Sequence, residues 1–186
     1  SMKLALCFSG QPRFTEECSG SILANVIQKH DVDVFAHLWF DEDLQTKPYK
    51  FGGTGAWEAQ RIQENAIETF QKIYQPVSLA VEKSKFFGDP DLDADFEASE
   101  AKYWPGGIEE QPDFQKRQIN NSLSYFYSLC EANRLRKLYE YDNKIKYDYV
   151  IRCRTDSVVQ VPIPYEKFDP NAIHFTSLQA HPPFLN

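Results

Sequence analysis

The chain has 186 residues, the size of about one domain, and its 42% hydrophobic and 15% aromatic content excludes a disordered chain, a coiled coil and a collagen-like repeat. Lysine and arginine number 20 against 27 aspartates and glutamates, and this net charge of −7 disfavours nucleic-acid binding, which needs a basic surface. No apolar run reaches the ~20 residues of a membrane span, and no signal peptide is visible. We therefore expect a cytoplasmic protein without a transmembrane segment.

The first 40 residues predict a strand, a helix and a second strand. Residues 4–8 are continuously apolar, which is typical of a parallel strand covered on both faces. Apolar residues then recur at helical spacing as far as Ile27, and Thr15 is the expected N-cap. Residues 32–40 form the next apolar run. This order is that of a βαβ unit.

The middle of the chain alternates between regular and irregular segments. Residues 41–57 contain proline and a Gly-Gly-Thr-Gly sequence, which predicts a loop. An amphipathic helix follows over about 59–74 and ends before Pro76, and residues 77–81 predict a third strand. We expect residues 84–114 to form a long, irregular, acidic loop.

The last third of the chain predicts one long helix and further strands. The helix is expected over about 115–141, with Asp113 as its N-cap and an apolar side made of Ile119, Leu123, Phe126, Tyr127, Cys130 and Leu138. Strands are expected at 149–151, 158–161 and 172–175. Residues 2–186 therefore read as one α/β domain, with a mostly parallel central sheet flanked by helices.

Ligands of open parallel sheets bind beyond the carboxyl ends of the strands, so polar residues that directly follow a strand are candidates. Three groups qualify: Ser9 to Arg13 after the first strand, Asp41 to Asp43 after the second, and Arg152, Arg154 and Asp156 after the strand at 149–151. Arginines can offset phosphate charge, and Asp156 could carry a divalent cation against a diphosphate. The alternatives are an ordinary βα turn for the first group and a ligand-free ion pair for the third.

Other polar residues and motifs give weaker indications of a binding or metal site. Asp41 and Asp43 form a rival metal site, and His37 is either a core histidine or a polar group in the cleft. Neither a dinucleotide fingerprint nor a Walker loop is present. The four cysteines lack CxxC spacing, which predicts buried, reduced thiols rather than a zinc site.

Four blocks of the sequence resemble a family of glycosyltransferase-like proteins found in bacteria, algae, large DNA viruses and phages. The blocks lie in the family's order over about residues 2–160: MKLALCFSGQPR at 2–13, DVFAHLW at 33–39, SLSYFYSLCEAN at 122–133 and YDYVIRCRTD at 147–156.

This resemblance implies a Rossmann-like GT-A fold and a glycosyltransferase that uses a nucleotide-diphospho-sugar donor and an unknown acceptor. The residues expected to contact the nucleotide sugar are Ser9, Gly10, Gln11, Arg13, His37, Arg152 and Arg154, and the resemblance itself places the nucleotide over Ser9 to Arg13. It places Mn²⁺ or Mg²⁺ on Asp156, although Arg154 stands where the family's motif has its first acid.

Only 30 residues follow Asp156, whereas the resemblance implies a longer C-terminal part that carries acceptor contacts. We therefore expect a domain shortened at its C-terminus, as a truncated form, a naturally short variant or a domain cut from a larger protein. The alternative function is a non-catalytic GT-A-like nucleotide-binding or scaffold module that lacks the acceptor half.

Overall fold

The computed structural model describes residues 2–41, 62–85, 87 and 112–175, with only the backbone described for 112–119. The elements, in chain order, are β1 (Lys3–Gly10), α1 (Thr15–Ile22), the π-helix η1 (Leu23–Ile27), β2 (Asp31–Trp39), α3 (Ala66–Tyr74), β3 (Ser78–Glu82), α5 (Pro112–Asn143), β4 (Tyr149–Cys153) and the 3₁₀-helix η2 (Tyr165–Lys167).

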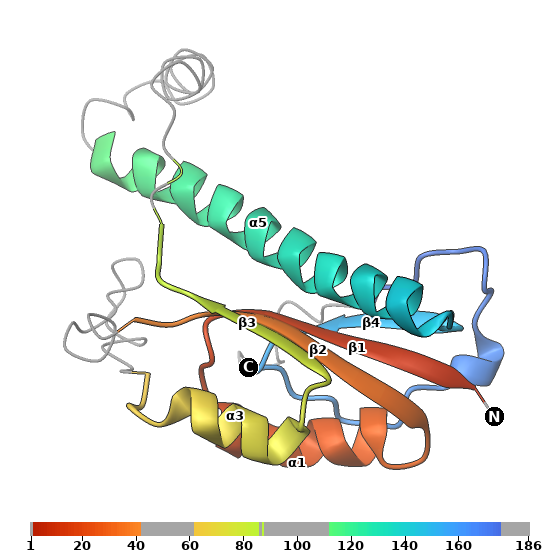
Figure 1. Cartoon of the computed structure of the whole chain (residues 1–186). Helices are drawn as coiled ribbons and strands as arrows, with labels where there is room; N and C mark the ends of the chain where they lie inside the picture. Colours follow the sequence, from red (N-terminus) through yellow and green to blue (C-terminus); the bar gives the residue numbers. More distant parts are fainter. Residues whose placement is uncertain (1, 42–61, 86, 88–111, 176–186) are drawn as a thin grey trace, which may run out of the picture.

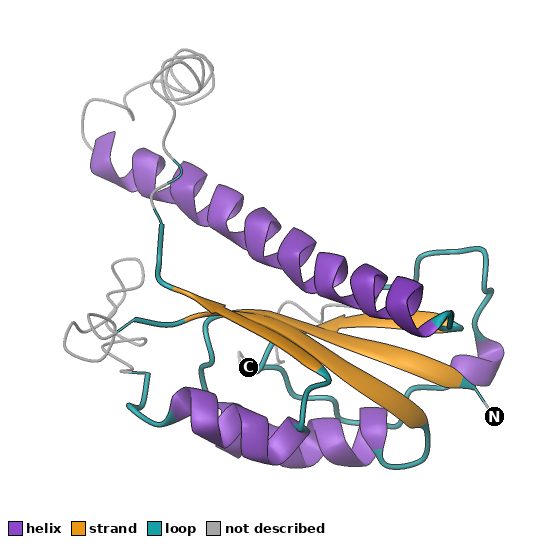
Figure 2. Cartoon of the chain, in the orientation of Figure 1, coloured by secondary structure: helices purple, strands orange, loops and turns teal. Residues whose placement is uncertain are grey.

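The four strands form one parallel sheet in the order β3-β2-β1-β4. Helices α1 and α3 cover one face and α5 covers the other (Figures 1 and 2). The chain steps from β1 to β2 to β3 in one direction and then returns over α5 to place β4 on the other side of β1. The predicted α/β fold with a parallel sheet is confirmed, and its winding is consistent with a Rossmann-like arrangement.

The core lies on both faces of β1 and β2, as the continuous apolar runs predicted. Leu6 and Phe8 point toward α1 and α3, where they pack with Ile22 and Phe70. The alternate residues of β1, Ala5 and Cys7, point toward α5, where they pack with Phe35 of β2 and Ala132 of the helix. Side chains of a strand alternate between faces, so a strand covered on both sides needs apolar residues at every position.

The predicted packing face of α5 is wrong in part: Tyr127 lies against His37 and Trp39 of the sheet, but other predicted residues do not pack there. Phe126 is 58% exposed and Leu138 47% exposed, whereas Ser128 and Ala132 are completely buried against the sheet. Cys130 is likewise exposed, so the expectation that the cysteines are buried fails for this one.

Two predicted caps and two predicted strands also differ from the structure. Thr15 is the first residue of α1, and the N-cap is Phe14 with φ 49°. Asp113 lies inside α5, which already begins at Pro112 and so takes over the last residues of the predicted loop at 84–114. Most of that loop lies outside the described residues.

The segments 158–161 and 172–175 are not strands. The first runs below the sheet, where Val159 packs against the core and its amide N–H donates to the Ser21 hydroxyl at 3.1 Å. This side-chain partner replaces the ladder bond that the predicted strand would have made. None of the helices in the described ranges is long and apolar enough to cross a membrane.

Candidate functional site

The carboxyl ends of β1 and β4 mark the point where the order of strands reverses. From β1 the chain proceeds to β2 on one side, while β4 lies on the other side. In open α/β sheets this switch point is the usual place for a ligand. The turns at 11–13 and 154–156 follow these two strands, so the structure brings together two groups that are distant in sequence.

Thr155 joins the two turns, and we call this contact the junction. The Thr155 side chain is 1% exposed, and its hydroxyl lies 2.8 Å from the carbonyl oxygen of Arg13 and 3.2 Å from that of Gln11. The hydroxyl has a single hydrogen, which these two acceptors share. Thr155 could not be singled out from the sequence, because both of its partners lie more than 140 residues earlier in the chain.

Arg154 and Asp156 form a two-pronged ion pair beside the junction. Nε and Nη2 of Arg154 donate to Oδ1 and Oδ2 of Asp156, each at 2.8 Å. Burial alone would raise the pKa of Asp156, but hydrogen bonds and charge from Arg154, with a smaller effect of Arg13, hold that pKa below its ordinary value. Asp156 is therefore an ionised carboxylate that fixes the plane of the Arg154 guanidinium.

The expected alternation of Arg152, Arg154 and Asp156 on one side is wrong. Strand β4 ends at Cys153, and the chain then turns, with the Ser157 amide N–H donating to the Arg154 carbonyl at 3.2 Å. Arg152 is still in the strand and points toward α5, where its guanidinium carbon lies 4.3 Å from the ring centre of Tyr125. Arg152 is thus stacked on a helix, away from the ion pair.

The turn after β1 presents a glutamine and an arginine that contact each other. The Arg13 guanidinium donates from Nε and Nη2 to the side-chain oxygen of Gln11, the first at 2.8 Å. Gly10 precedes them with φ 105°, a conformation that side chains disfavour, and a Cβ built there would meet nothing within 4 Å. Its amide N–H donates to the Ser128 hydroxyl at 2.8 Å and so points away from the surface.

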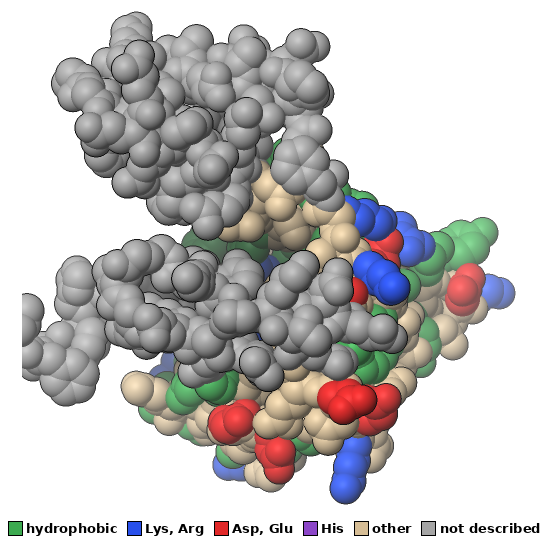
Figure 3. Space-filling model, turned by 90° about the vertical axis from the view of Figure 1, so that its left-hand side faces the viewer, with side chains coloured by type: hydrophobic (Ala, Val, Ile, Leu, Met, Phe, Trp, Pro, Cys, Tyr) green, Lys and Arg blue, Asp and Glu red, His purple; other side chains and the backbone are tan. Residues whose placement is uncertain are grey.

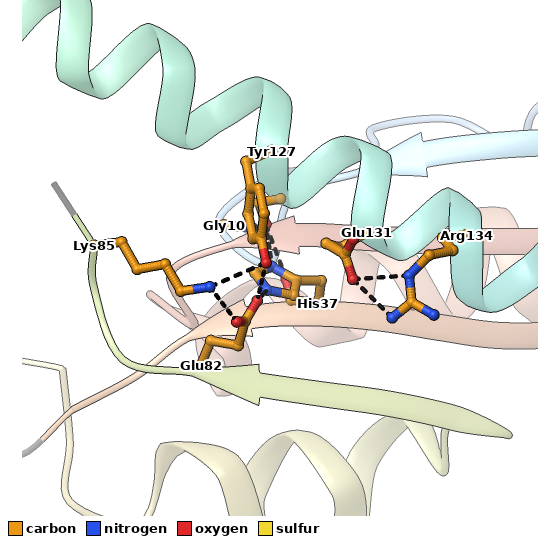
Figure 4. A network of polar contacts seen from close by, with 8 residues as sticks. Gly10, His37, Glu82, Lys85, Tyr127, Glu131 and Arg134 are labelled. Atoms are coloured by element: carbon orange, nitrogen blue, oxygen red, sulfur yellow. Dashed lines mark hydrogen bonds and ion pairs between the residues drawn. The ribbon is translucent and has the colours of Figure 1, made fainter. Parts of the chain in front are cut away.

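Ser9 and His37, both predicted to contact the nucleotide sugar, are buried. His37 is completely inaccessible, and both of its ring nitrogens have partners: Nδ1 lies 2.7 Å from Ser128 Oγ and Nε2 lies 2.7 Å from Glu82 Oε2 (Figure 4). The core alternative for His37 is the one that the structure supports.

The carboxylate of Glu82, at the end of β3, accepts hydrogen bonds from His37, Lys85 and Tyr127. Lys85 Nζ donates to Oε1 at 2.6 Å, and the Tyr127 hydroxyl donates to Oε2 at 2.9 Å (Figure 4). The hydrogen bond from Lys85 is the main cause that lowers the pKa of Glu82 to about 2, and those from His37 and Tyr127 add to it. An ionised carboxylate only accepts, so the proton of His37 that faces Glu82 must reside on Nε2.

The described side chains do not fit the expected Mn²⁺ or Mg²⁺. A hard cation prefers several oxygen ligands, but both oxygens of Asp156 are bound by Arg154. No group of three or more potential ligands occurs among the residues that the structure describes. At the rival site, Asp41 accepts the Ser84 amide N–H at 3.2 Å, and Asp43 lies outside the described residues.

A pocket of about 230 Å³ lies beside the turn after β1, between it and the beginning of α3. Arg13 and Thr15 line it together with the first-turn acids of α1, Glu16 and Glu17. Acidic side chains also gather below this edge of the molecule, on the part formed by α1 and α3 (Figure 3). These carboxylates offset the positive end of the helix dipole, which disfavours an anion at the start of α1.

Comparison with protein-family models found no match, and comparisons with curated proteins and with solved structures found none either.

Proposed function

We propose that the chain is a GT-A-like glycosyltransferase that binds the diphosphate of a nucleotide sugar at the junction between the turns after β1 and β4. The observation that carries the proposal is the position of two arginines, Arg13 and Arg154, on turns tied together by Thr155 at the switch point of the sheet. The resemblance of the four sequence blocks supports the same proposal, because two of them, 2–13 and 147–156, contribute the residues of the junction.

The electrostatics of the junction favour an anionic ligand. Arg13 and Arg154 bring two guanidinium groups to the junction in a chain of net charge −7, with Asp156 paired to Arg154 and with Glu16 and Glu17 lining the pocket beside Arg13. In sugar transfer, the bond between the anomeric carbon and the diphosphate oxygen breaks, and negative charge develops on the departing diphosphate. Fixed cationic groups beside that oxygen stabilise the charge as it forms. Asp156 contributes by holding the guanidinium of Arg154 in one orientation.

Glu82 is unsuited to the role of catalytic base. Its pKa of about 2 lies far below neutral pH, and an efficient general base has a pKa near the working pH. We therefore assign Glu82 to the support of the site and name no catalytic base.

The test is isothermal titration calorimetry of the full chain with UDP, GDP, CDP and ADP and with their common sugar derivatives. The informative variant is Arg154→Gln, which should weaken binding about tenfold or more through the loss of a charge-assisted contact. Arg134→Gln is its matched control, because Arg134 also pairs with an acid, Glu131 at 2.8 Å, but on the surface of α5. Binding of no nucleotide, or equal loss in both variants, refutes the proposal.

Two further experiments test whether binding needs a cation and whether the sugar is transferred. Titrations in chelator and in Mn²⁺ test the cation expected from the sequence, and an affinity that is the same in both shows that nucleotide binding does not depend on it. Release of free sugar or transfer to an added acceptor distinguishes an enzyme from a binding module. A chain that binds a nucleotide sugar tightly and never consumes it is the module.

A further inference from the structure

The turn that carries Gln11 and Arg13 is held at both ends by buried hydroxyls. Thr155 binds the carbonyl oxygens of these two residues from the side of β4. At the other end, Ser128 of α5 accepts the amide N–H of Gly10, the last residue of β1. Ser128 is completely buried, so its hydroxyl cannot exchange this partner for bulk water.

His37 fixes the orientation of the Ser128 hydroxyl. Because Nε2 of His37 carries the proton donated to Glu82, a neutral ring offers Nδ1 as an acceptor, and Ser128 donates to it at 2.7 Å. The Gly10 amide donates to Ser128, Ser128 donates to His37, and His37 donates to Glu82. These three consecutive hydrogen bonds therefore all run in the same direction, toward the Glu82 carboxylate. Such aligned bonds strengthen one another in a buried setting.

A charged His37 would leave this arrangement intact. With both ring nitrogens protonated, Nδ1 donates to Ser128, and the hydroxyl hydrogen turns to the His37 carbonyl oxygen, which lies 3.2 Å away. The two lone pairs of Ser128 then accept from His37 and from Gly10. The titratable groups that face the ring are Glu82 of β3 and Tyr127 of α5, with Lys85 held on both of them. The tie to Gly10 therefore persists in either protonation state of His37.

We propose that Ser128 and His37 are positioning residues, which hold Gly10 and thereby the place at which Gln11 and Arg13 meet a diphosphate. The inference rests on the proposed function and adds to it two residues that never touch the ligand. Gly10 admits the backbone conformation that begins the turn, and Ser128 and His37 select the one orientation of its amide.

The test uses the full chain, with UDP and GDP as probes. The variants are Ser128→Ala, which removes the hydroxyl, and Ser128→Cys, which keeps nearly the same shape but accepts a hydrogen bond only weakly. Ser122→Ala is the matched control, since Ser122 lies on the same helix and is exposed. Calorimetry gives the affinity, amide hydrogen exchange by NMR reports on Gly10, and the ¹⁵N shifts of the His37 ring report on the loss of its donor.

We expect both Ser128 variants to bind the nucleoside diphosphate at least about tenfold more weakly and the Gly10 amide to exchange at least about tenfold faster. The Nδ1 signal of His37 should shift in both, and Ser122→Ala should change none of these quantities. If Ser128→Ala does not fold, Ser128→Cys alone decides the outcome.

Two results would overturn the inference, and they differ from failure of the proposed function. Unchanged affinity in the Ser128 variants, despite faster exchange at Gly10, shows that the tie serves stability alone. Unchanged exchange at Gly10 shows that the tie does not hold the amide. If the parent chain binds no nucleoside diphosphate at all, the proposed function fails and the positioning role falls with it.

Discussion

Two buried threonines, Thr155 and Thr15, provide a direct test of the junction, because the hydroxyl of Thr155 is hydrogen-bonded and that of Thr15 has no such bond to the described residues. Thr155 donates to backbone carbonyls of the turn after β1, whereas the hydroxyl of Thr15 finds no hydrogen-bond partner among the described residues. Both side chains are at most 4% exposed. Thr→Val replaces a hydroxyl by a methyl group of similar volume, so neither substitution leaves a cavity of consequence.

The expected effects have opposite signs. Thr155→Val removes one hydrogen bond, worth about 1 kcal/mol net, and leaves the Arg13 carbonyl without this partner, so we expect a loss of about 1–2 kcal/mol in the free energy of unfolding. Thr15→Val removes a buried polar group that gains nothing in return, so the free energy of unfolding should stay equal or rise by up to about 1 kcal/mol.

Urea denaturation of the two variants and the parent, followed by circular dichroism, measures both values. Thermal melting should agree, with a shift of about 2–4 °C for each kcal/mol in a chain of this length. Equal destabilisation by the two substitutions would refute the reasoning, because it would mean that the contacts of Thr155 contribute nothing beyond the general cost of the change.

Three further predictions concern other parts of the chain. Gly10→Ala should lower the free energy of unfolding by about 1–2 kcal/mol, because φ 105° strains a residue with a side chain. Gly20→Ala inside α1 should raise the free energy of unfolding by about 0.5–1 kcal/mol, and urea denaturation measures both changes. Because the pKa of Glu82 is depressed to about 2 from 4.5, its contribution to stability is present above pH 4.5 and lost as the pH falls toward 2. Glu82→Gln should flatten that part of the stability profile, and an unaltered profile contradicts the assignment. A thiol reagent followed by mass spectrometry should label exposed Cys130 first, and buried Cys7, with a pKa raised by burial to about 12, only on unfolding; early labelling of Cys7 would contradict its burial.

Local patterns were sufficient for the four strands of the sheet and for the class of fold, but they failed at 158–161 and 172–175, which were expected to be strands and are not. Continuous apolar runs predicted β1 and β2 because a strand covered on both faces needs apolar residues at every position. The end of α3 was equally predictable, since Pro76 disfavours helical backbone at Gln75, which closes the helix in a left-handed conformation. The strand-end rule also located the turns that meet at the junction.

The side of α5 that packs on the sheet could not be predicted from the periodicity of apolar residues. The sheet-facing side of α5 carries Ser128 and Ala132, with Leu135 and Tyr139 packed beside them, while Phe126 and Leu138 are exposed, so only some of its apolar residues mark the buried face. A helix can approach a sheet closely where its side chains are small, and that preference depends on the surface opposite it. For the same reason the pattern alone could not place a polar residue such as Ser128 in the core.

Local patterns predicted the four strands of the sheet and the edge at which polar residues gather, but they also predicted strands at 158–161 and 172–175 that the structure does not contain. The roles of the polar residues became evident only in the fold, where His37 is a core group bound to Ser128, 91 residues away, and Thr155 joins two turns. The physical reason is that a strand or helix is set by neighbouring residues, whereas a buried hydrogen bond needs both partners, which the fold alone brings together.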